Sequence, residues 1–344
     1  MSAQELNRIA KAIIASGKGI LAADESTGTM GKRLEGIGAP NTEENRRAYR
    51  DLLFTTPEVE NFIGGVILFD ETLRQKASDG TLFGELLSSK GMIPGIKVDT
   101  GAKPLAGSHG EQITEGLDGL RERFAEYHRL GARFAKWRAV IEIDPEGRPS
   151  AQAIHANAEA LARYAALSQE AGIVPIVEPE VLMDGTHTIE RCRDVTHAVL
   201  SKVFEYLAVH NVALEGMLLK PNMIIPGLKC SRQASPEEVA KATLACFKEV
   251  VPATVAGIVF LSGGQSELDA TANLQAMNAR GGNPWPLSYS YGRALQASTL
   301  KAWRTEAANV PAAQAAFYHR AHMNTLAALG QYTVAAEEGQ RAAG

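Results

Sequence analysis

Cysteine is scarce in this sequence, and its spacing excludes two kinds of site. The 344 residues contain three cysteines, Cys192, Cys230 and Cys246, and no two of them form a C-x-x-C pair. Because the number is odd and the spacing wide, we expect no disulfide framework, free thiols and a reducing compartment, the cytoplasm. The histidines show no H-E-x-x-H motif. We therefore predict neither a catalytic metal nor a cofactor.

Long hydrophobic runs and an excess of charge are also missing. No uncharged apolar stretch approaches the roughly 20 residues that a membrane-spanning helix needs, so we expect no membrane partner. The 35 basic and 39 acidic side chains leave a net charge of −4, which gives no reason to expect a nucleic-acid partner. Residues 2–16 carry Glu5, Arg8 and Lys11 among apolar residues, which indicates an amphipathic helix rather than a secretion signal. A hydrophobic content of 45% is typical of a soluble globular protein.

Eight short apolar runs recur along the chain, and each is followed by polar residues and a helix-like stretch. They cover residues 19–23, 65–69, 93–96, 133–143, 173–177, 214–220, 255–261 and 286–291. Runs of this length predict buried strands, and their alternation with helices predicts a parallel sheet. Eight is the number that closes a (β/α)8 barrel. We therefore predict an α/β fold, a single TIM-barrel domain over residues 1–344 with extra N- and C-terminal helices. Two doubly wound domains are the alternative, although no linker divides the sequence.

Helix-start signals separate several of these strands. Ser235-Pro236-Glu237-Glu238 combines a capping serine, a proline at the first helical position and a capping-box glutamate. Ser266 and Thr42 precede acidic residues in a similar way. Pro175 fits less well, because a proline inside a closed barrel removes a hydrogen-bond donor from the sheet. We expect its strand either to begin at Ile176 or to carry a bulge.

Charged and polar residues stand where the predicted strands end, which is where barrel enzymes hold their active sites. This rule brings together Asp24, Asp70, Lys97, Lys136, Arg138, Glu178, Glu180, Lys220, Ser262 and Arg293. Lys220 follows an apolar run and precedes Pro221, which ends the strand. Such a lysine is either a surface residue with a buried stem or a desolvated amine. The repetition of lysines at strand ends favours the desolvated amine.

The chemistry that these residue types support is Schiff-base catalysis. Cationic neighbours and burial both favour the neutral form of a lysine, and the neutral amine attacks a ketone to form an imine. We predict Lys220 as this amine and Glu178 as the acid/base that expels water. Asp24 is the candidate for accepting a hydroxyl proton, and Lys136 and Glu180 complete the predicted catalytic set. For each carboxylate the alternative is an ordinary salt-bridge role.

Glycine-rich segments after the last two strands predict a phosphate site. Ser262, Gly263 and Gly264 precede a helix, and Gly292 and Arg293 follow the eighth strand. Backbone N–H groups at a helix start bind anions, and barrels commonly hold phosphate at these two strands. A second anion site is predicted from Ser26, Thr29, Arg33 and Lys97. The alternative for each glycine segment is a simple turn.

Seven blocks of sequence together resemble class I fructose-bisphosphate aldolase. They are LAADESTGT at 21–29, IKVD at 96–99, FAKWR at 134–138, VEPE at 177–180, LLKPNM at 218–223, FLSGGQS at 260–266 and SYGRALQAS at 290–298. The resemblance implies a homotetramer that cleaves a small sugar phosphate, fructose 1,6-bisphosphate, into dihydroxyacetone phosphate and glyceraldehyde 3-phosphate. It assigns the Schiff-base lysine to Lys220, the dehydration acid/base to Glu178 and the carbon–carbon cleavage base to Asp24. Lys136 and Arg138 become supporting cations.

The resemblance also assigns the phosphates and exposes two departures. It places Ser262, Gly263, Gly292 and Arg293 at one phosphate and Ser26, Thr29 and Lys97 at the other. Thr29 stands where the family has serine, and the chain lacks the terminal tyrosine of many members. Residues 335–344 are small or charged, so we expect a mobile C-terminal tail that contributes little to the chemical step. Two other readings are a pyridoxal-phosphate protein anchored at Lys220 and a non-catalytic scaffold.

Overall fold

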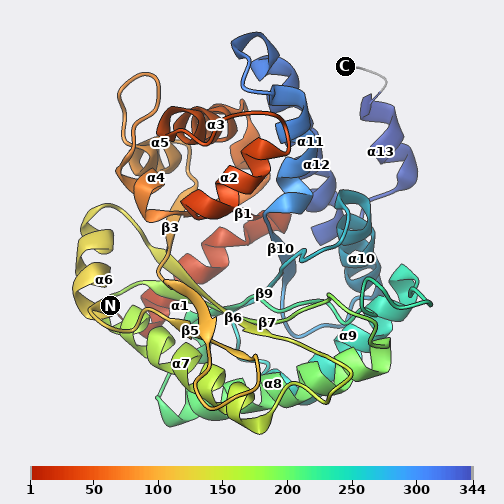
Figure 1. Cartoon of the computed structure of the whole chain (residues 1–344). Coiled ribbons are helices and arrows are strands. Elements are labelled where there is room, and N and C mark those ends of the chain that lie inside the picture. The colour runs from red at the N-terminus through yellow and green to blue at the C-terminus, as the bar shows by residue number, and fades with distance from the viewer. Residues whose placement is uncertain (1, 342–344) are drawn as a thin grey trace.

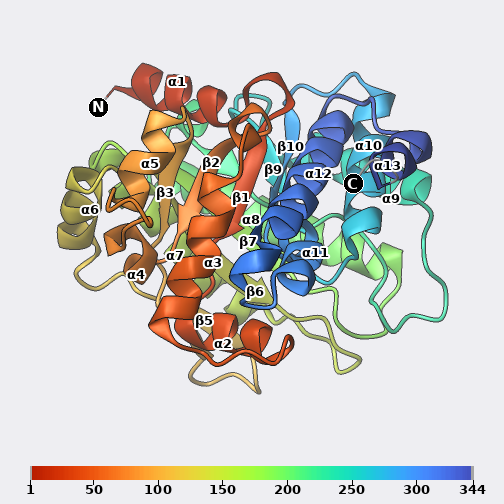
Figure 2. The same cartoon turned by 90° about the horizontal axis from the view of Figure 1, so that it is seen from above.

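Eight parallel strands form a closed barrel at the centre of the molecule (Figures 1 and 2). The computed structural model describes residues 2–341. The barrel strands are β1 (Gly19–Ala23), β2 (Ile63–Leu68), β3 (Ile93–Lys97), β6 (Phe134–Ile141), β7 (Val174–Val181), β8 (Leu218–Leu219), β9 (Ile258–Phe260) and β10 (Leu287–Tyr291). Each pairs with the barrel strands before and after it, and β1 pairs with β10 to close the ring. The predicted (β/α)8 barrel is confirmed.

Helices enclose the barrel and occupy the predicted gaps between strands (Figure 1). They are α1 (Ala3–Ile13), α2 (Thr27–Glu35), α3 (Glu43–Thr55), α4 (Asp70–Arg74), α5 (Phe83–Ser89), α6 (Leu120–Arg129), α7 (Ala151–Glu170), α8 (Ile189–Val209), α9 (Pro236–Val250), α10 (Glu267–Arg280), α11 (Arg293–Trp303), α12 (Val310–Ala328) and α13 (Val334–Arg341). The capping box at Ser235 and Glu238 opens α9 as predicted. Thr42 and Ser266 also cap their helices through side-chain oxygens. None of the helices within residues 2–341 has the length and apolar composition needed to cross a membrane.

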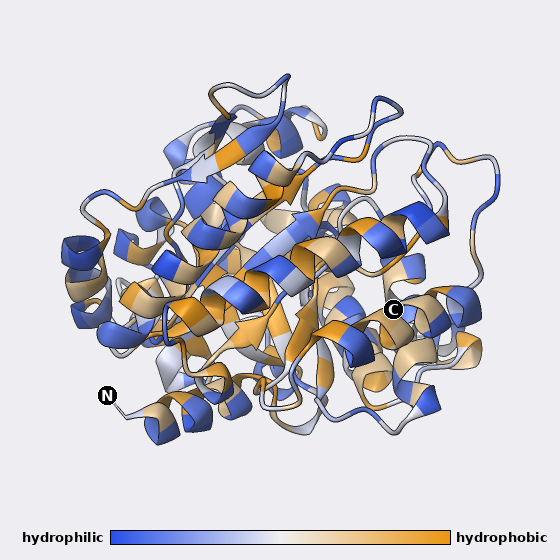
Figure 3. Ribbon diagram, turned by 90° about the horizontal axis from the view of Figure 1, so that it is seen from below, coloured by the Kyte–Doolittle hydropathy of each residue, from blue (hydrophilic) through white to orange (hydrophobic). Residues whose placement is uncertain are grey.

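The barrel interior is apolar at its amino-terminal end. Inward residues of the strands form one cluster with Leu6, Ala10 and Ile13 of α1, which closes this end. Phe134 belongs to this cluster, and a Cβ at Gly95 would lie 2.3 Å from its ring. Glycine at position 95 therefore makes room for the phenylalanine. The hydropathy colouring shows the same division, with apolar strands at the centre and polar residues on the outer helices (Figure 3).

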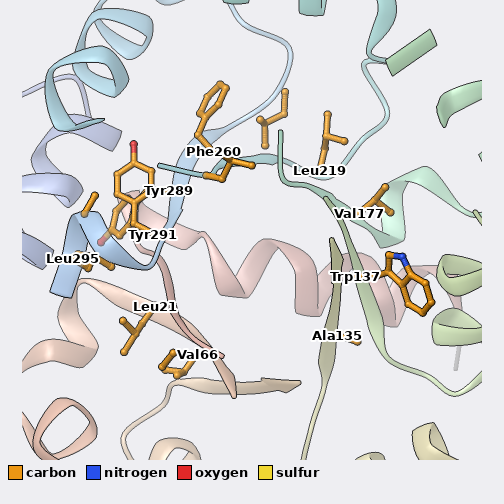
Figure 4. Close-up of a cluster of buried hydrophobic side chains, with 14 of the residues drawn as sticks. Leu21, Val66, Ala135, Trp137, Val177, Leu219, Phe260, Tyr289, Tyr291 and Leu295 are labelled. Atoms are coloured by element: carbon orange, nitrogen blue, oxygen red, sulfur yellow. The ribbon is translucent and has the colours of Figure 1, made fainter. Parts of the chain in front are cut away.

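The opposite faces of the strands pack against the helices. Leu21, Val66, Trp137, Val177 and Leu219 are among the buried side chains of this outer cluster (Figure 4). Because strand residues alternate between faces, these outward positions fix the inward ones. Leu218 belongs to the interior cluster and Leu219 to the outer one. The side chain of Lys220 therefore continues the inward row, as the sequence predicted.

The sixth barrel strand is shorter than predicted. Leu214–Gly216 forms a 3-10 turn, and β8 consists only of Leu218 and Leu219. Side chains, rather than a neighbouring strand, donate hydrogen bonds to the backbone carbonyls of this turn. Asn7 donates to the carbonyl of Glu215 at 2.6 Å, and Gln169 donates to that of Gly216 at 3.3 Å. The turn does not pair with a neighbouring strand, because side chains of α1 and α7 lie beside it and bond to its carbonyls. An antiparallel hairpin of β4 (Gly101–Pro104) and β5 (Gln112–Glu115), absent from the prediction, lies beyond β3.

Pro175 lies inside β7, so the prediction of a start at Ile176 is wrong, as is that of a bulge. The strand pairs with β6 without a register shift from Val174 to Val181. The N–H of Val174 donates to Arg133 of the β6 side, so position 175 faces β8. Pairing with β8 begins only at Ile176. Pro175 therefore faces a place where the ladder has no partner, and its missing N–H costs no hydrogen bond.

The C-terminal segment forms α13, and one of its side chains is buried. Glu337 is 5% exposed and forms ion pairs with Arg320 and with His319 (Nε2–Oε1 2.9 Å), both on α12. The hydroxyl of Tyr332 donates to the same carboxylate at 3.2 Å. Mobility of residues 335–344 stays a prediction, and residues 342–344 lie outside the described part of the chain. The premise that this segment buries little is wrong at Glu337.

Candidate active site

The charged residues at the strand ends line one cavity of about 980 Å³ at the barrel mouth. On β1, β3, β6, β7 and β8 the inward row is apolar deep in the barrel and ends in a charged side chain at the mouth. Of the predicted strand-end and site residues, the cavity is lined by Asp24, Ser26, Thr29, Arg33, Asp70, Lys97, Lys136, Arg138, Glu178, Glu180, Lys220, Ser262, Gly263, Gly292 and Arg293. Gly264 is absent from the lining; its N–H instead donates to the sulfur of Met183 at 3.0 Å.

Lys220 and Glu178 face each other across the cavity floor. The distance from Lys220 Nζ to Glu178 Oε1 is 3.2 Å, and both side chains are at most 5% exposed. Their pairing follows from adjacent strands, since Val177 pairs with Leu219 in the β7–β8 register. The second oxygen of Glu178 is buried without a hydrogen bond and lies 3.5 Å from Lys136 Nζ. An amine and a carboxylate so placed are within proton-transfer distance of each other.

Lys136 sits at the centre of three carboxylates. Its Nζ is 2.8 Å from Asp24 Oδ2 and 3.9 Å from Asp99 Oδ2, in addition to its contact with Glu178. Burial lowers the pKa of Lys136, but the three carboxylates outweigh burial and raise it above its usual value. The sequence analysis expected neighbouring cations to favour the neutral form of a lysine, and at Lys136 the three carboxylates have the opposite effect.

Asp24 is held in its ionised form by the same group of charges. Burial raises the pKa of Asp24, but the positive charges of Lys136 and Lys220 outweigh it and hold the pKa well below its usual value. Asp24 follows directly after β1, where its inward direction continues that of Ile20 and Ala22. The cavity therefore contains an ionised carboxylate that is able to accept a proton.

Arg138 and Glu180 form an ion pair higher in the mouth. They lie on β6 and β7, two residues beyond Lys136 and Glu178 respectively, so both point inward. The Glu180 side chain is 6% exposed and that of Arg138 is 42% exposed. The guanidinium is accordingly the part that an incoming molecule contacts.

A glycine-lined cradle follows β9 and β10. Gly263 has φ of +55°, where any other side chain is strained, and a Cβ there would lie 2.1 Å from the flexible end of Met183, which would have to move. Gly292 immediately precedes α11, whose first residue is Arg293. The Arg293 guanidinium donates to the carbonyl of Gly263 at 2.5 Å and joins the two segments. The helix start, the glycines and the guanidinium form a surface suited to a phosphate.

The second predicted anion group divides in the structure. Ser26 caps α2, and its hydroxyl is 3.1 Å from that of Thr29. Lys97, across the cavity, bonds to the carbonyl oxygen of Asp99 and to its carboxylate, both at 2.7 Å. Arg33 lies away from Lys97: its Nη2 would be 3.6 Å from a Cβ at Gly292. Ser26 and Thr29 lie at the start of α2, Lys97 ends β3, and Arg33 lies beside Gly292.

Several lining residues were missing from the predicted site, and three of them are buried and polar. Glu25 and Asp99 are buried acids next to the predicted Asp24 and Lys97, and Ser290 is an inward residue of β10 whose buried hydroxyl has no partner. The alternation of faces along a strand was a signal for Ser290: it lies two residues before the predicted Gly292 and therefore on the same face. No local signal marks Glu25, since its partners are distant in sequence. Within the described part of the chain, no three His, Cys, Asp or Glu side chains are grouped to hold a metal ion; catalysis without metal or cofactor stays a prediction.

Comparisons with known proteins agree on one family. The family described as "Fructose-bisphosphate aldolase class-I" matches residues 5–344. A probable fructose-bisphosphate aldolase class 1 of Xanthomonas campestris is 57% identical over 96% of this chain and 99% of its own length. The fructose-bisphosphate aldolase of Dictyostelium discoideum is 55% identical, over 96% of this chain and 93% of its own. A crystal structure of the Plasmodium falciparum aldolase in complex with TRAP and an inhibitor has 49% identity and a TM-score of 0.95, and the match covers 96% of each chain.

Proposed function

Because this chain belongs to the class I fructose-bisphosphate aldolase family, we propose that Lys220 is the amine that attacks its ketose substrate. The protein is a lyase of glycolysis that reversibly cleaves fructose 1,6-bisphosphate to dihydroxyacetone phosphate and glyceraldehyde 3-phosphate. The family assignment favours this activity over the pyridoxal-phosphate and scaffold alternatives. The observation that carries the assignment of Lys220 is its buried amine, 3.2 Å from Glu178 at the cavity floor.

Glu178 serves the formation of the imine. The neutral amine of Lys220 attacks the ketone carbon, and the resulting carbinolamine loses its hydroxyl group as water. Glu178 supplies the proton that turns this hydroxyl into water, and in hydrolysis it returns the proton from water. Its distance of 3.2 Å from Lys220 Nζ supports this role. The second oxygen of Glu178, which accepts no hydrogen bond although it lies 3.5 Å from Lys136 Nζ, supports it as well.

Asp24 accepts the proton that starts carbon–carbon cleavage. It removes a proton from the hydroxyl on the carbon that becomes the aldehyde, and the bond between this carbon and its ketone-side neighbour breaks. The released electron pair moves into the protonated imine of Lys220 and gives an enamine. Lys136, 2.8 Å from Asp24, keeps the carboxylate ionised for this step. Protonation of the enamine and hydrolysis then free dihydroxyacetone phosphate.

Two cationic surfaces receive the two phosphates. The ketone-side phosphate is bound by Ser262, Gly263, Gly292 and Arg293, and the aldehyde-side phosphate by Ser26, Thr29 and Lys97. The α11 start and the Arg293–Gly263 bond support the first assignment. Arg138 and Glu180 border the entrance above the reacting carbons. A phosphate anchored at each end orients the sugar for attack.

Borohydride trapping tests the role of Lys220. Dihydroxyacetone phosphate with borohydride should leave a stable adduct on Lys220, located by peptide mass mapping, and should inactivate the enzyme. Lys220→Met should abolish both the adduct and cleavage while the fold is kept. The control is Lys241→Met, at an exposed position on α9, which should trap normally. An adduct on Lys136 or Lys97 with Lys220 unmodified would overturn the assignment.

Assembly and location complete the proposal. We propose that the chain forms a homotetramer in the cytoplasm. The family resemblance supports the tetramer, and three free thiols support a reducing compartment. Light scattering after size-exclusion chromatography should give four times the mass of one chain. A monomer at micromolar concentration would refute the assembly.

A further inference from the structure

The strand that leads to Lys220 is attached to its neighbour β7 over a short length. β8 has two residues, and its pairing with β7 reaches Val177, whereas β7 continues to Val181. The N–H of Lys220 donates to the carbonyl of Val177 at 2.8 Å and adds one more hydrogen bond. The next residue, Pro221, has no N–H, so strand pairing cannot continue through it. The backbone around Lys220 therefore needs another attachment to β7.

A side chain takes the place of β8 at the far end of β7. The N–H of Val174 donates to the β6 side, and the two sides alternate along the strand, so the odd-numbered positions face β8. Two of these positions are Pro175 and Pro179, which carry no N–H. The N–H of Val181 donates to the side-chain oxygen of Asn222 at 3.0 Å. Asn222 thus accepts the hydrogen bond that a longer β8 would have accepted.

The amide of Asn222 is buried and bonded at both ends. The residue is 1% exposed. Its nitrogen donates to the hydroxyl of Thr196 on α8 at 3.2 Å and to the carbonyl of Met223 at 3.1 Å. Because a buried amide that turned would leave these groups unpaired, the side chain is held in one orientation. It therefore fixes the segment after Lys220 against β7.

Two hydrogen bonds enclose the pair that is proposed to form the imine. The bond from Lys220 to Val177 lies just before Glu178 along β7. The bond from Val181 to Asn222 lies three residues after Glu178. The separation of 3.2 Å between Lys220 Nζ and Glu178 Oε1 depends on both bonds, because they set the distance between the two backbones. The second bond uses a side chain, so a substitution is able to remove it.

We propose that Asn222 is a positioning residue whose amide replaces the interrupted strand pairing and holds Lys220 at reacting distance from Glu178. This inference rests on the proposed roles of Lys220 and Glu178 in imine formation. Asn222 lies outside the lining of the cavity, so it acts through the backbone rather than on the substrate. A displacement of about 1 Å at the reacting atoms slows a reaction by up to about a hundredfold.

Rapid-quench trapping measures imine formation directly. Dihydroxyacetone phosphate is mixed with the full-length enzyme, borohydride is added after set times, and the adduct on Lys220 is quantified by peptide mass mapping. For Asn222→Ala, the rate of adduct formation should fall at least about tenfold. The kcat for fructose 1,6-bisphosphate should fall with it, while the KM stays within about threefold because the phosphate-binding residues are unchanged.

Thr243→Val is the matched control. Thr243 is buried on α9, and its hydroxyl accepts from the N–H of Ile224 at 3.0 Å, so it holds the same loop from α9 instead of from β7. This variant should lose stability as Asn222→Ala does, but its trapping rate should stay within about twofold of wild type. An unchanged trapping rate in Asn222→Ala, or an equal slowing in both variants, would overturn the inference.

Thr196→Val keeps the inference testable if Asn222→Ala does not fold. It leaves the oxygen of Asn222 in place but removes the α8 acceptor that orients the amide, so trapping should slow at least about threefold. An unchanged rate in this variant also refutes the role of Asn222. The wild type tests the premise separately, because an adduct on another lysine refutes the proposed role of Lys220 itself. A Lys220 adduct that forms equally fast in wild type and Asn222→Ala refutes only the role of Asn222.

Discussion

Replacing Glu337 by glutamine should destabilise the protein and leave catalysis intact. The side chain of Arg320 is 1% exposed, and Glu337 is the carboxylate that neutralises it. Removing one partner of a buried ion pair costs about 3–5 kcal/mol, because the remaining charge stays desolvated. Arg320 keeps its bond to Thr271 at 2.9 Å, and a glutamine oxygen still accepts a hydrogen bond. We therefore expect the free energy of unfolding to fall by about 3 kcal/mol, at the lower end of that range.

The pH dependence of this contribution follows from the pKa of Glu337. Burial raises the pKa, but hydrogen bonds from Arg320 and His319 outweigh burial and lower it. A carboxyl with a lowered pKa in the folded state stabilises the protein above its unfolded pKa, near 4.5. The contribution is lost as the pH falls through the folded value. The difference between wild type and Glu337→Gln should be constant at neutral pH and shrink below pH about 4.5.

Urea denaturation followed by circular dichroism measures the stability, and a coupled assay measures kcat for fructose 1,6-bisphosphate. Glu338→Gln is the matched control, because Glu338 is exposed on the same helix; its free energy of unfolding should stay within about 0.5 kcal/mol of wild type. The kcat of Glu337→Gln should change less than about threefold, or ~0.7 kcal/mol of barrier. Deletion of residues 335–344 should have the same two effects. An equal loss in the control, or a hundredfold fall in kcat in an assembled variant, would show that the reasoning is wrong.

Three other predictions concern the cavity and the barrel. Arg293→Ala should raise the KM for both fructose 1,6-bisphosphate and fructose 1-phosphate strongly, because a guanidinium matches phosphate oxygens in a way that a point charge does not; steady-state kinetics with both substrates measures this. Prolonged dialysis against a chelator should leave activity unchanged, and activity that zinc restores after such treatment would contradict the imine mechanism. Gly95→Ala should lower the free energy of unfolding by about 1–3 kcal/mol, because the added methyl group overpacks against Phe134. Gly91→Ala provides the comparison: Gly91 has φ of +76° and open space around it, so this change introduces backbone strain without overpacking.

The sequence was sufficient for the barrel, which follows from eight apolar runs alternating with helical stretches, and for most of the mouth, which follows from the alternation of faces along each strand. Lys136 and Arg138 stand two residues apart on β6, as do Glu178 and Glu180 on β7, and parity alone places all four inside. Lys220 was identifiable because Pro221 marks the end of its strand. These inferences needed only local sequence and the rule that barrel sites lie at the carboxyl ends of strands.

The remaining features depend on contacts between distant segments. Glu25 pairs with Arg50, and Gln296 joins them from the far end of the chain. The loss of strand at Leu214–Gly216 depends on α1 and α7, which no local pattern around the turn reveals. Burial of Glu337 likewise requires Arg320, which lies 17 residues earlier on α12. Such pairings form only when the helices have assembled around the barrel, and no regular spacing of residues in the sequence indicates them.

The closure of the barrel by α1 leaves the two products a single way out. With Leu6, Ala10, Ile13 and Phe134 packed together at the other end, the mouth that admits the sugar is also the exit for its fragments. In the mechanism proposed above, the three-carbon aldehyde is free after cleavage, while the other fragment is still covalently attached to Lys220 at the floor. The water that hydrolyses the imine has to arrive through the same opening. The products therefore leave one after the other: the aldehyde leaves first, and the fragment bound to Lys220 follows after water has hydrolysed the imine.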